Sequence, residues 1–192
     1  MNYFVRYVFE NLTSQDTLLK SDYIVVSPDA GGVKRAEKFA NLLGGLDVAI
    51  MHKNRPKPGE IGSMKLVGSV EGRIVLMIDD IADTCGTLYK AALLLKENGA
   101  KKTIAFATHG VLSGSAFETL EKAKEIDFSL VVTDTIDVAA NASSKKISLP
   151  SNLEILSISE MAAVAIMSSN LSGSLSKFYD YATWLNLFDL FK

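Results

Sequence analysis

The sequence of 192 residues contains a single cysteine, Cys85, only four prolines, and no clear excess of charge of either sign. One cysteine cannot form an internal disulfide, which fits a reducing compartment such as the cytoplasm. The 20 Lys and Arg residues against 22 Asp and Glu residues leave a net charge of −2, so no global basic field exists to hold nucleic acid. No apolar run reaches the length of a membrane span, and the start, MNYFVRYVFE, does not read as a signal peptide. We therefore expect a cytoplasmic protein without a membrane span or a nucleic-acid partner.

Short β-branched runs alternate with helical patterns along most of the chain, and 48% of the residues are hydrophobic. This length and composition are typical of one globular domain with its own core. The patterns predict strands at residues 22–27, 47–52, 73–79, 102–108, 130–135 and 153–157, and helices at 32–43, 87–98, 115–125 and 159–167. The alternation predicts an α/β fold, a parallel sheet flanked by helices on both faces. Ligands of such sheets bind at the carboxyl ends of the strands, beside helix N-termini.

The first strand end with unusual residues is SPDAGG, residues 27–32. Two glycines let the backbone approach an anion closely, and the helix that follows offers free N–H groups. Asp29 is out of place in an anion site unless a divalent cation lies between its carboxylate and phosphate oxygens, as Mg²⁺ does in many sites. A plain helix cap with a glycine-rich turn is the alternative.

The second strand end is VLMIDDIADTCGT, residues 75–87, in which an apolar strand is followed by two adjacent carboxylates. Carboxylates accept hydrogen bonds from sugar hydroxyls, directly or through a metal. The loop of Thr, Gly and Thr then opens a helix, and its hydroxyls and backbone amides suit a phosphomonoester. A coincidental cap explains single residues of this run but not the whole of it.

The third strand end, HKNR at residues 52–55, leads into an irregular segment with two prolines and two glycines, residues 53–62. Lys53, Arg55 and Lys57 form the only tight basic cluster in a nearly neutral chain. Cations on a loop of this kind can stabilise charge that develops on a reacting phosphate. A solvated charged loop is the alternative.

Other chemistries lack their motifs. The sequence has no GxxxxGK[ST] phosphate loop and no Gly-x-Ser-x-Gly elbow, and its two histidines lack zinc-site spacing. We interpret Cys85, at a predicted helix start, as a small loop residue and not as a nucleophile, because no activating partner is evident. His109 ends another predicted strand, where it either lines a site or serves the structure.

The segments VVSPDAGG, HKNR, VLMIDDIADTCGT and ATHGVLSG together resemble the C-terminal half of ribose-phosphate diphosphokinase, also called phosphoribosyl diphosphate (PRPP) synthetase. The resemblance runs from about Tyr23 to about Ile166. The acidic run alone indicates the wider type I phosphoribosyltransferase-like fold. The SPDAGG loop and the Lys-x-Arg pair narrow the resemblance to the synthetase.

This resemblance implies a role for each matching residue. The diphosphate and Mg²⁺ would be held by the loop Asp29, Ala30, Gly31 and Gly32, with Asp29 as the metal ligand. Lys53 and Arg55 would stabilise the transition state. Ribose 5-phosphate would be bound by Asp79, Asp80, Asp83, Thr84, Cys85, Gly86 and Thr87. The family reaction moves the diphosphoryl group of MgATP onto the anomeric hydroxyl of ribose 5-phosphate and releases AMP. Positioning and electrostatics dominate such transfers.

The sequence also departs from the family pattern. The family has a second, N-terminal domain that supplies much of the ATP site, and we expect it to be absent from this chain, which begins a short helix before the first strand. We expect a domain over residues 1–176, with a Ser-rich flexible joint at 168–176, and an aromatic helical tail at 177–192. We expect the tail to pack against this domain or against a partner in a homo-oligomer or a complex with a synthetase subunit. Binding to a membrane surface is the alternative, against which the small number of cations in the segment argues. We expect the isolated chain to bind ribose 5-phosphate and to turn over weakly or not at all.

Two other functions stay open at this point. One is a non-catalytic, regulatory homologue that associates with a PRPP synthetase; the intact basic pair and acidic run argue against it. The other is a phosphoribosyltransferase that consumes PRPP with a nucleobase, for which the sequence has no recognisable base-binding segment.

Overall fold

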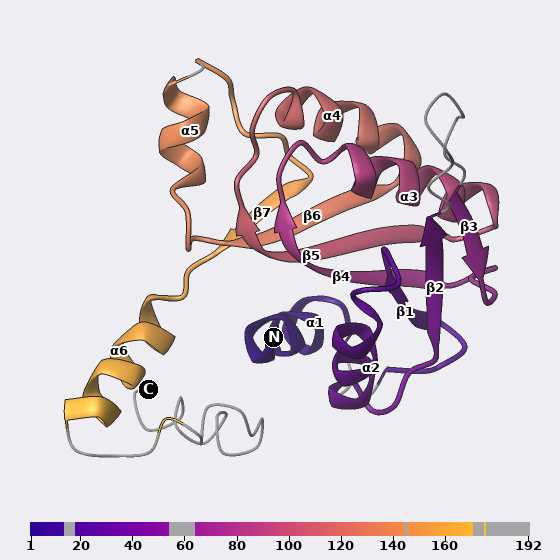
Figure 1. The fold of residues 1–192 in the computed structure, drawn as a ribbon, viewed down its shortest axis with the longest axis horizontal. Helices are drawn as coiled ribbons and strands as arrows, with labels where there is room; N and C mark the ends of the chain where they lie inside the picture. The colour runs from indigo at the N-terminus through magenta and orange to yellow at the C-terminus, as the bar shows by residue number, and fades with distance from the viewer. Residues whose placement is uncertain (14–17, 54–63, 145, 171–174, 176–192) are drawn as a thin grey trace.

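The computed structural model describes residues 1–13, 18–53, 64–144, 146–170 and 175 of the chain (Figure 1). Its helices and strands follow one another in this order: α1 (Asn2–Asn11), β1 (Tyr23–Ser27), α2 (Val33–Leu42), β2 (Val48–Lys53), β3 (Met64–Val67), β4 (Ile74–Ala82), α3 (Gly86–Glu97), β5 (Lys102–Gly110), α4 (Ala116–Ala123), a 3₁₀ turn η1 (Lys124–Ile126), β6 (Phe128–Thr133), α5 (Val138–Ser144), β7 (Leu153–Leu156) and α6 (Ser159–Asn170).

The seven strands form one sheet in the order β3-β2-β1-β4-β5-β6-β7. Neighbouring strands run parallel except at one edge, where β3 pairs antiparallel with β2. The chain order reverses between β1 and β4, which lie side by side at the centre with Val26 opposite Met77. In open α/β sheets, such a reversal opens a crevice at the carboxyl ends of the strands, where ligands bind.

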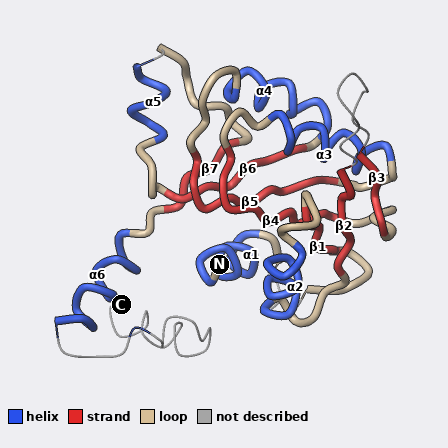
Figure 2. Tube along the Cα trace, viewed as in Figure 1, coloured by secondary structure: helices blue, strands red, loops and turns tan. Residues whose placement is uncertain are grey.

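Each face of the sheet is covered by helices, because the central strands are apolar on both sides. On one face α3 and α4 pack against a cluster that includes Met77, Leu88 and Leu120. On the other face α1 and α2 pack against a cluster centred on Phe106. Figures 1 and 2 show the sheet between these two pairs of helices. Helix α6 projects away from the sheet at the left of the view, and of its residues only Val164 is buried.

The predicted α/β fold is confirmed: a mostly parallel sheet lies between helices. All six predicted strands and all four predicted helices are present, with ends that differ from the prediction by at most three residues. The largest shift at a strand end concerns β4, which continues three residues past Asp79 to Ala82, paired with β5 as far as Gly110. The acidic pair therefore belongs to the strand itself and is held by the sheet.

The structure corrects the sequence analysis at three places. The sheet is not wholly parallel, because the edge strand β3 runs antiparallel to β2. Its side chains alternate between half-buried and exposed, as is typical of an edge strand, but four residues are too few for a periodic pattern to show in the sequence. The seven-residue helix α5 was not expected, for the same reason of length. Residues 168–170 of the predicted flexible joint form the last turn of α6 instead.

The predicted aromatic tail at residues 177–192 lies outside the described residues, as does most of the irregular basic segment, residues 54–63. The division into a domain and a tail therefore stays a prediction. None of the helices formed by the described residues is long and apolar enough to cross a membrane.

Candidate functional site

A pocket of about 580 Å³ lies at the carboxyl ends of β1, β2 and β4. It is lined by residues 28–31, which follow β1, by His52 near the end of β2, and by residues 79–85 and 87–88 of β4, the loop after it and α3. All three strand ends singled out in the sequence thus contribute to one pocket. The parallel sheet brings them together, since it places the carboxyl ends of its strands at one edge.

The loop after β1 is held by its own polar groups. The buried Ser27 hydroxyl donates to the Asp29 carbonyl oxygen at 2.7 Å, and Asp29 Oδ1 accepts the Gly32 N–H at 2.8 Å. A Cβ atom on Gly32 would lie 2.8 Å from Ser27 Oγ, closer than real contacts allow, so a larger residue here would displace the hydroxyl that holds the loop. The Asp29 side chain is exposed at the pocket and keeps oxygen lone pairs for a ligand or cation.

The acidic pair at the end of β4 is bridged by an arginine that the sequence analysis missed. Arg35, on α2, places Nη1 2.9 Å from Asp79 Oδ1 and Nη2 2.8 Å from Asp80 Oδ2. Backbone amides complete the arrangement: the Asp80 N–H donates to Asp79 Oδ1 and the Ile81 N–H donates to Asp80 Oδ1, each at 2.9 Å. Nothing in the spacing of residues 35 and 79 indicates this contact, which tertiary packing creates.

The two carboxyl groups of the pair differ in environment. Burial and the neighbouring Asp80 carboxylate raise the pKa of Asp79, although the Arg35 charge opposes this rise. Burial is slight at Asp80, and the hydrogen bond with Asp79 together with the Arg35 charge lowers the pKa of Asp80. Asp79 is the more enclosed of the two, with a side-chain exposure of 22% against 61%. This makes Asp79 the more sheltered hydrogen-bond acceptor in the pocket.

The loop from β4 to α3 has the form of an anion site. Cys85 precedes the helix in a left-handed conformation, φ 60° and ψ 0°, and α3 begins at Gly86. Backbone N–H groups converge where such a residue leads into a helix start, and the helix dipole adds positive potential there. Thr84 and Thr87 line the pocket with exposed side chains. The loop therefore offers amide and hydroxyl donors to one bound anion.

The Asp83 side chain in this loop contacts a second segment of the chain. Its Oδ1 accepts a hydrogen bond from the Ser113 hydroxyl, which lies in the segment after β5. This hydrogen bond connects the loop after β4 to the segment after β5. Asp83 also lines the pocket, and its predicted part in binding ribose 5-phosphate stays a prediction. Ser113 is a second residue that the sequence analysis missed, because its partner lies 30 residues away.

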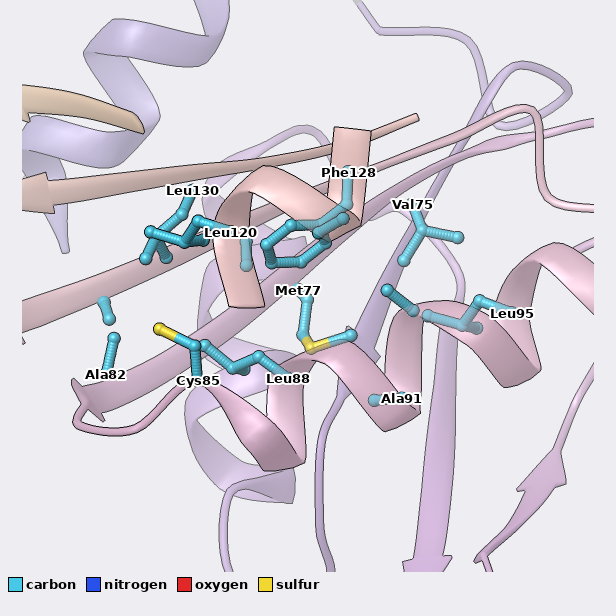
Figure 3. Packing of buried hydrophobic residues seen from close by; sticks show 14 of the residues in the cluster. Val75, Met77, Ala82, Cys85, Leu88, Ala91, Leu95, Leu120, Phe128 and Leu130 are labelled. Atoms are coloured by element: carbon cyan, nitrogen blue, oxygen red, sulfur yellow. The ribbon is translucent and has the colours of Figure 1, made fainter. Parts of the chain in front are cut away.

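Cys85 is buried, with 4% of its surface exposed, and lies among the core side chains beside Leu88 (Figure 3). Burial, with a smaller contribution from the Asp83 charge, raises the pKa of the Cys85 thiol to about 12. The environment supports the interpretation of Cys85 as a packed loop residue, since a nucleophilic thiol needs a lowered pKa and access to solvent.

We expect Cys85 to resist alkylation in the folded chain. A thiol pKa raised from 9.0 to about 12 leaves roughly a thousandfold less thiolate at pH 8.5 than in the unfolded chain, because the reactive thiolate forms only as the pH approaches the pKa. The measurement is the rate of iodoacetamide labelling by mass spectrometry, with the urea-unfolded chain as control. Equal rates in the two states would contradict the buried placement.

The basic strand end is described only in part. Lys53 is the last residue of β2, paired with Met64 of β3, so its backbone stands at the same sheet edge as the pocket. Arg55 lies outside the described residues, and the roles predicted for Lys53 and Arg55 stay predictions. His52, the residue before, lines the pocket directly.

His109, left open by the sequence, is not among the residues that line this pocket. Its Nδ1 lies 2.9 Å from Thr135 Oγ1, and Thr135 Oγ1 in turn donates to the Thr108 carbonyl oxygen at 3.0 Å. The imidazole therefore joins β5 to the segment after β6, which is a structural role.

With this geometry in place, comparison with known proteins is informative. The sequence profile of the phosphoribosyl synthetase-associated domain matches residues 51–180, more than half of the chain. The chain belongs to this family. Its relatives include a ribose-phosphate pyrophosphokinase from Hyphomonas neptunium, 44% identical over 161 residues, which span 84% of this chain and 49% of the relative. Ribose-phosphate pyrophosphokinase 3 from Saccharomyces cerevisiae is 42% identical over 172 residues, 90% of this chain and 49% of the relative.

Among solved structures, the phosphoribosylpyrophosphate synthetase from Mycobacterium smegmatis matches this chain with a TM-score of 0.73 at 35% identity. The match covers 90% of this chain and 51% of that one. The domain thus spans about half the length of the relatives it matches. The resemblance read from the motifs is confirmed at the level of family and fold.

Proposed function

We propose that this domain binds ribose 5-phosphate and the diphosphate of PRPP, and that it is the phosphosugar-binding part of a ribose-phosphate diphosphokinase. The observation that carries the proposal is the lining of one pocket: the acidic pair, the anion loop after β4 and the glycine loop after β1 all border the same cavity of about 580 Å³. This combination suits a sugar phosphate that carries a second, polyanionic group.

In this proposal each part of the ligand has its own subsite. The 5-phosphate takes the amides and hydroxyls of residues 84–87 at the start of α3, where the helix dipole favours an anion. The ribose hydroxyls donate to the carboxylates of Asp79 and Asp80. The diphosphate lies at residues 29–32, where α2 begins. Lys53 and Arg55 are proposed to stabilise the charge of the transferred group, on the strength of the family resemblance.

The residues present fit a magnesium ion that is held mainly by substrate. Among the described residues no group of three or more His, Cys, Asp or Glu side chains gathers to hold a metal. Mg²⁺ usually keeps several waters and binds one or two carboxylates plus substrate phosphates, and the exposed Asp29 carboxylate at the pocket supplies such a ligand. When bound there, the ion would neutralise phosphate charge; Asp29 would hold it beside the glycine loop.

The proposed reaction joins the anomeric oxygen of ribose 5-phosphate to the β-phosphorus of ATP, and the anomeric hydroxyl releases its proton to solvent. The bond between the β-phosphorus and the oxygen that bridges to the α-phosphorus breaks, and AMP leaves with that oxygen. In this proposal the described residues act by binding and orientation. They bind the 5-phosphate and the ribose hydroxyls, so that the anomeric hydroxyl faces the diphosphate loop. Because such transfers depend on positioning and electrostatics, no covalent catalysis by the domain is needed.

ATP turnover is proposed as a property of an assembly, either a homo-oligomer or a complex with a synthetase subunit. The family resemblance implies that a second domain contributes to the ATP site. All the residues proposed above to bind the sugar phosphate belong to this chain. We also propose a cytoplasmic location, which the lone free cysteine supports because reducing compartments keep thiols reduced.

The test is titration calorimetry of the 192-residue chain with ribose 5-phosphate, ribose and inorganic phosphate, in the presence and absence of Mg²⁺. We expect the affinity for ribose 5-phosphate to be at least about ten times that for inorganic phosphate. Each hydrogen bond from a sugar hydroxyl to a carboxylate adds roughly 1.5–3 kcal/mol to binding, and about 1.4 kcal/mol corresponds to a factor of ten. Ribose alone serves as the control for the phosphate subsite and should bind weakly. Equal affinities for ribose 5-phosphate and inorganic phosphate would refute sugar recognition.

A further inference from the structure

The acidic pair in the pocket is held by one side chain from another element. Arg35 contacts both carboxylates with separate nitrogens, at 2.9 Å to Asp79 Oδ1 and 2.8 Å to Asp80 Oδ2. A planar guanidinium that spans two carboxylates restricts the orientation of both, which a lysine ammonium does not do. It also offsets the repulsion between two adjacent negative charges.

The hydrogen bonds from Arg35 and from the backbone do not reach all four oxygens of the acidic pair. Asp79 Oδ1 accepts from Arg35 and from the Asp80 amide, Asp80 Oδ1 accepts from the Ile81 amide, and Asp80 Oδ2 accepts from Arg35. Among the described residues, Asp79 Oδ2 is the one oxygen of the four that accepts neither from Arg35 nor from a backbone amide. Asp79 lines the pocket and is the more enclosed carboxylate.

Arg35 can hold this arrangement because its helix is firmly placed. Helix α2 buries Ala36, Phe39 and Ala40 against the sheet, so Arg35 starts from a fixed backbone. Its Nη1 is also close to the helix start: a Cβ atom on Gly32 would lie 3.8 Å from it. The guanidinium thus stands between the glycine loop and the end of β4.

We propose that Arg35 is a positioning residue for sugar recognition, which orients the acidic pair so that Asp79 Oδ2 accepts a hydrogen bond from a ribose hydroxyl. The inference rests on the proposed function for the identity of the sugar phosphate, and it adds a residue whose role is exerted through Asp79 and Asp80. The 5-phosphate subsite at the start of α3 does not involve Arg35, so the sugar and phosphate contributions separate.

Variants at this position test the proposal. Arg35→Gln removes the charge and the bridge, and Arg35→Lys keeps the charge but reaches one carboxylate at a time. Lys38→Gln is the matched control, because it removes one positive charge from the same helix at a residue that borders another cavity. Calorimetry measures the affinity of each variant for ribose 5-phosphate and for inorganic phosphate, and urea unfolding verifies that each chain is folded.

We expect Arg35→Gln to weaken binding of ribose 5-phosphate roughly tenfold, with phosphate affinity changed by less than about threefold, the scale expected for one hydrogen bond to a charged group. Arg35→Lys should lie between Arg35→Gln and the wild type, and Lys38→Gln should match the wild type. If Arg35→Gln does not fold, Arg35→Lys carries the same comparison.

Three outcomes would overturn the role of Arg35. One is unchanged affinity for ribose 5-phosphate in Arg35→Gln. Another is an equal loss for phosphate and ribose 5-phosphate, which indicates general damage to the pocket. The third is full affinity in Arg35→Lys, which shows that charge alone suffices. A wild-type chain that binds ribose 5-phosphate no better than phosphate is a different result, and it contradicts the proposed function itself.

Discussion

Gly86→Ala should cost the chain most of its affinity for ribose 5-phosphate while leaving it at least as stable as the wild type. A Cβ atom on Gly86 would meet only Thr84 Oγ1, at an ordinary contact distance of 3.7 Å, so the fold has room for alanine. Alanine also restricts the unfolded chain, which stabilises a protein by about 0.4–1 kcal/mol at a compatible site. The methyl group instead occupies space at the start of α3, where the proposed function places the approach of the phosphate to the backbone.

The expected loss of affinity is about a hundredfold. One or two charge-assisted hydrogen bonds from backbone amides would be lengthened or lost, and such bonds contribute roughly 1.5–3 kcal/mol each. Calorimetry with ribose 5-phosphate and with inorganic phosphate should show the loss for both ligands, and urea unfolding should show no loss of stability. This pattern differs from that expected for Arg35→Gln, which spares phosphate.

Substitutions at Thr87 provide the matched control for the anion loop. Thr87→Val removes the hydroxyl at nearly constant volume, whereas Thr87→Ser keeps it. Thr87→Ser should bind ribose 5-phosphate almost as the wild type does, and Thr87→Val more weakly. Unchanged phosphate binding in Gly86→Ala would place the phosphate elsewhere in the pocket and contradict the assigned subsite.

Phe106→Ala should lower the free energy of unfolding by about 3–5 kcal/mol, the usual range for removing a fully buried aromatic ring. Phe106, in the middle of β5, is 0% exposed, and its ring centroid lies 5.3 Å from that of Phe4, 5.9 Å from that of Tyr7 and 5.6 Å from that of Phe39. These rings belong to α1 and α2, so one side chain joins both helices of this face to the sheet. The measurement is urea unfolding followed by circular dichroism.

Phe128→Ala is the control on the opposite face of the sheet. Phe128 is equally buried, at 2% exposure, but packs in the cluster under α3 and α4. Both variants should be destabilised, whereas only Phe106→Ala loosens α2 and with it Arg35 and the glycine loop. A loss below about 1 kcal/mol in Phe106→Ala would contradict the packing described here, since such a value corresponds to a partly exposed ring.

Much of the candidate site was predictable, because its residues are contiguous and carry strong local signals. SPDAGG and DDIADTCGT follow β-branched runs, and glycine and threonine at a predicted helix start favour an anion site. Where these signals failed, the elements were short: the edge strand β3 has four residues and α5 has seven, too few for a hydrophobic period to show.

Contacts between residues that are far apart in the sequence could not be predicted from the sequence. Arg35 lies 44 residues before Asp79, and Ser113 lies 30 residues after Asp83, with no spacing rule to connect them. Asp83 is an example: its place in the motif gives no indication that its carboxylate accepts a hydrogen bond from a serine of the next loop.

The sequence by itself determined the alternation of strands and helices, the apolar central strands, and the three polar segments at strand ends, because hydrophobic period and turn chemistry are local properties of the chain. The tertiary structure alone decided that these segments share one pocket, that β3 runs antiparallel, and that Arg35 orients the acidic pair. These features depend on which strands become neighbours and on how closely α2 packs on the sheet. Contacts between residues far apart in the sequence cannot be predicted from local sequence patterns.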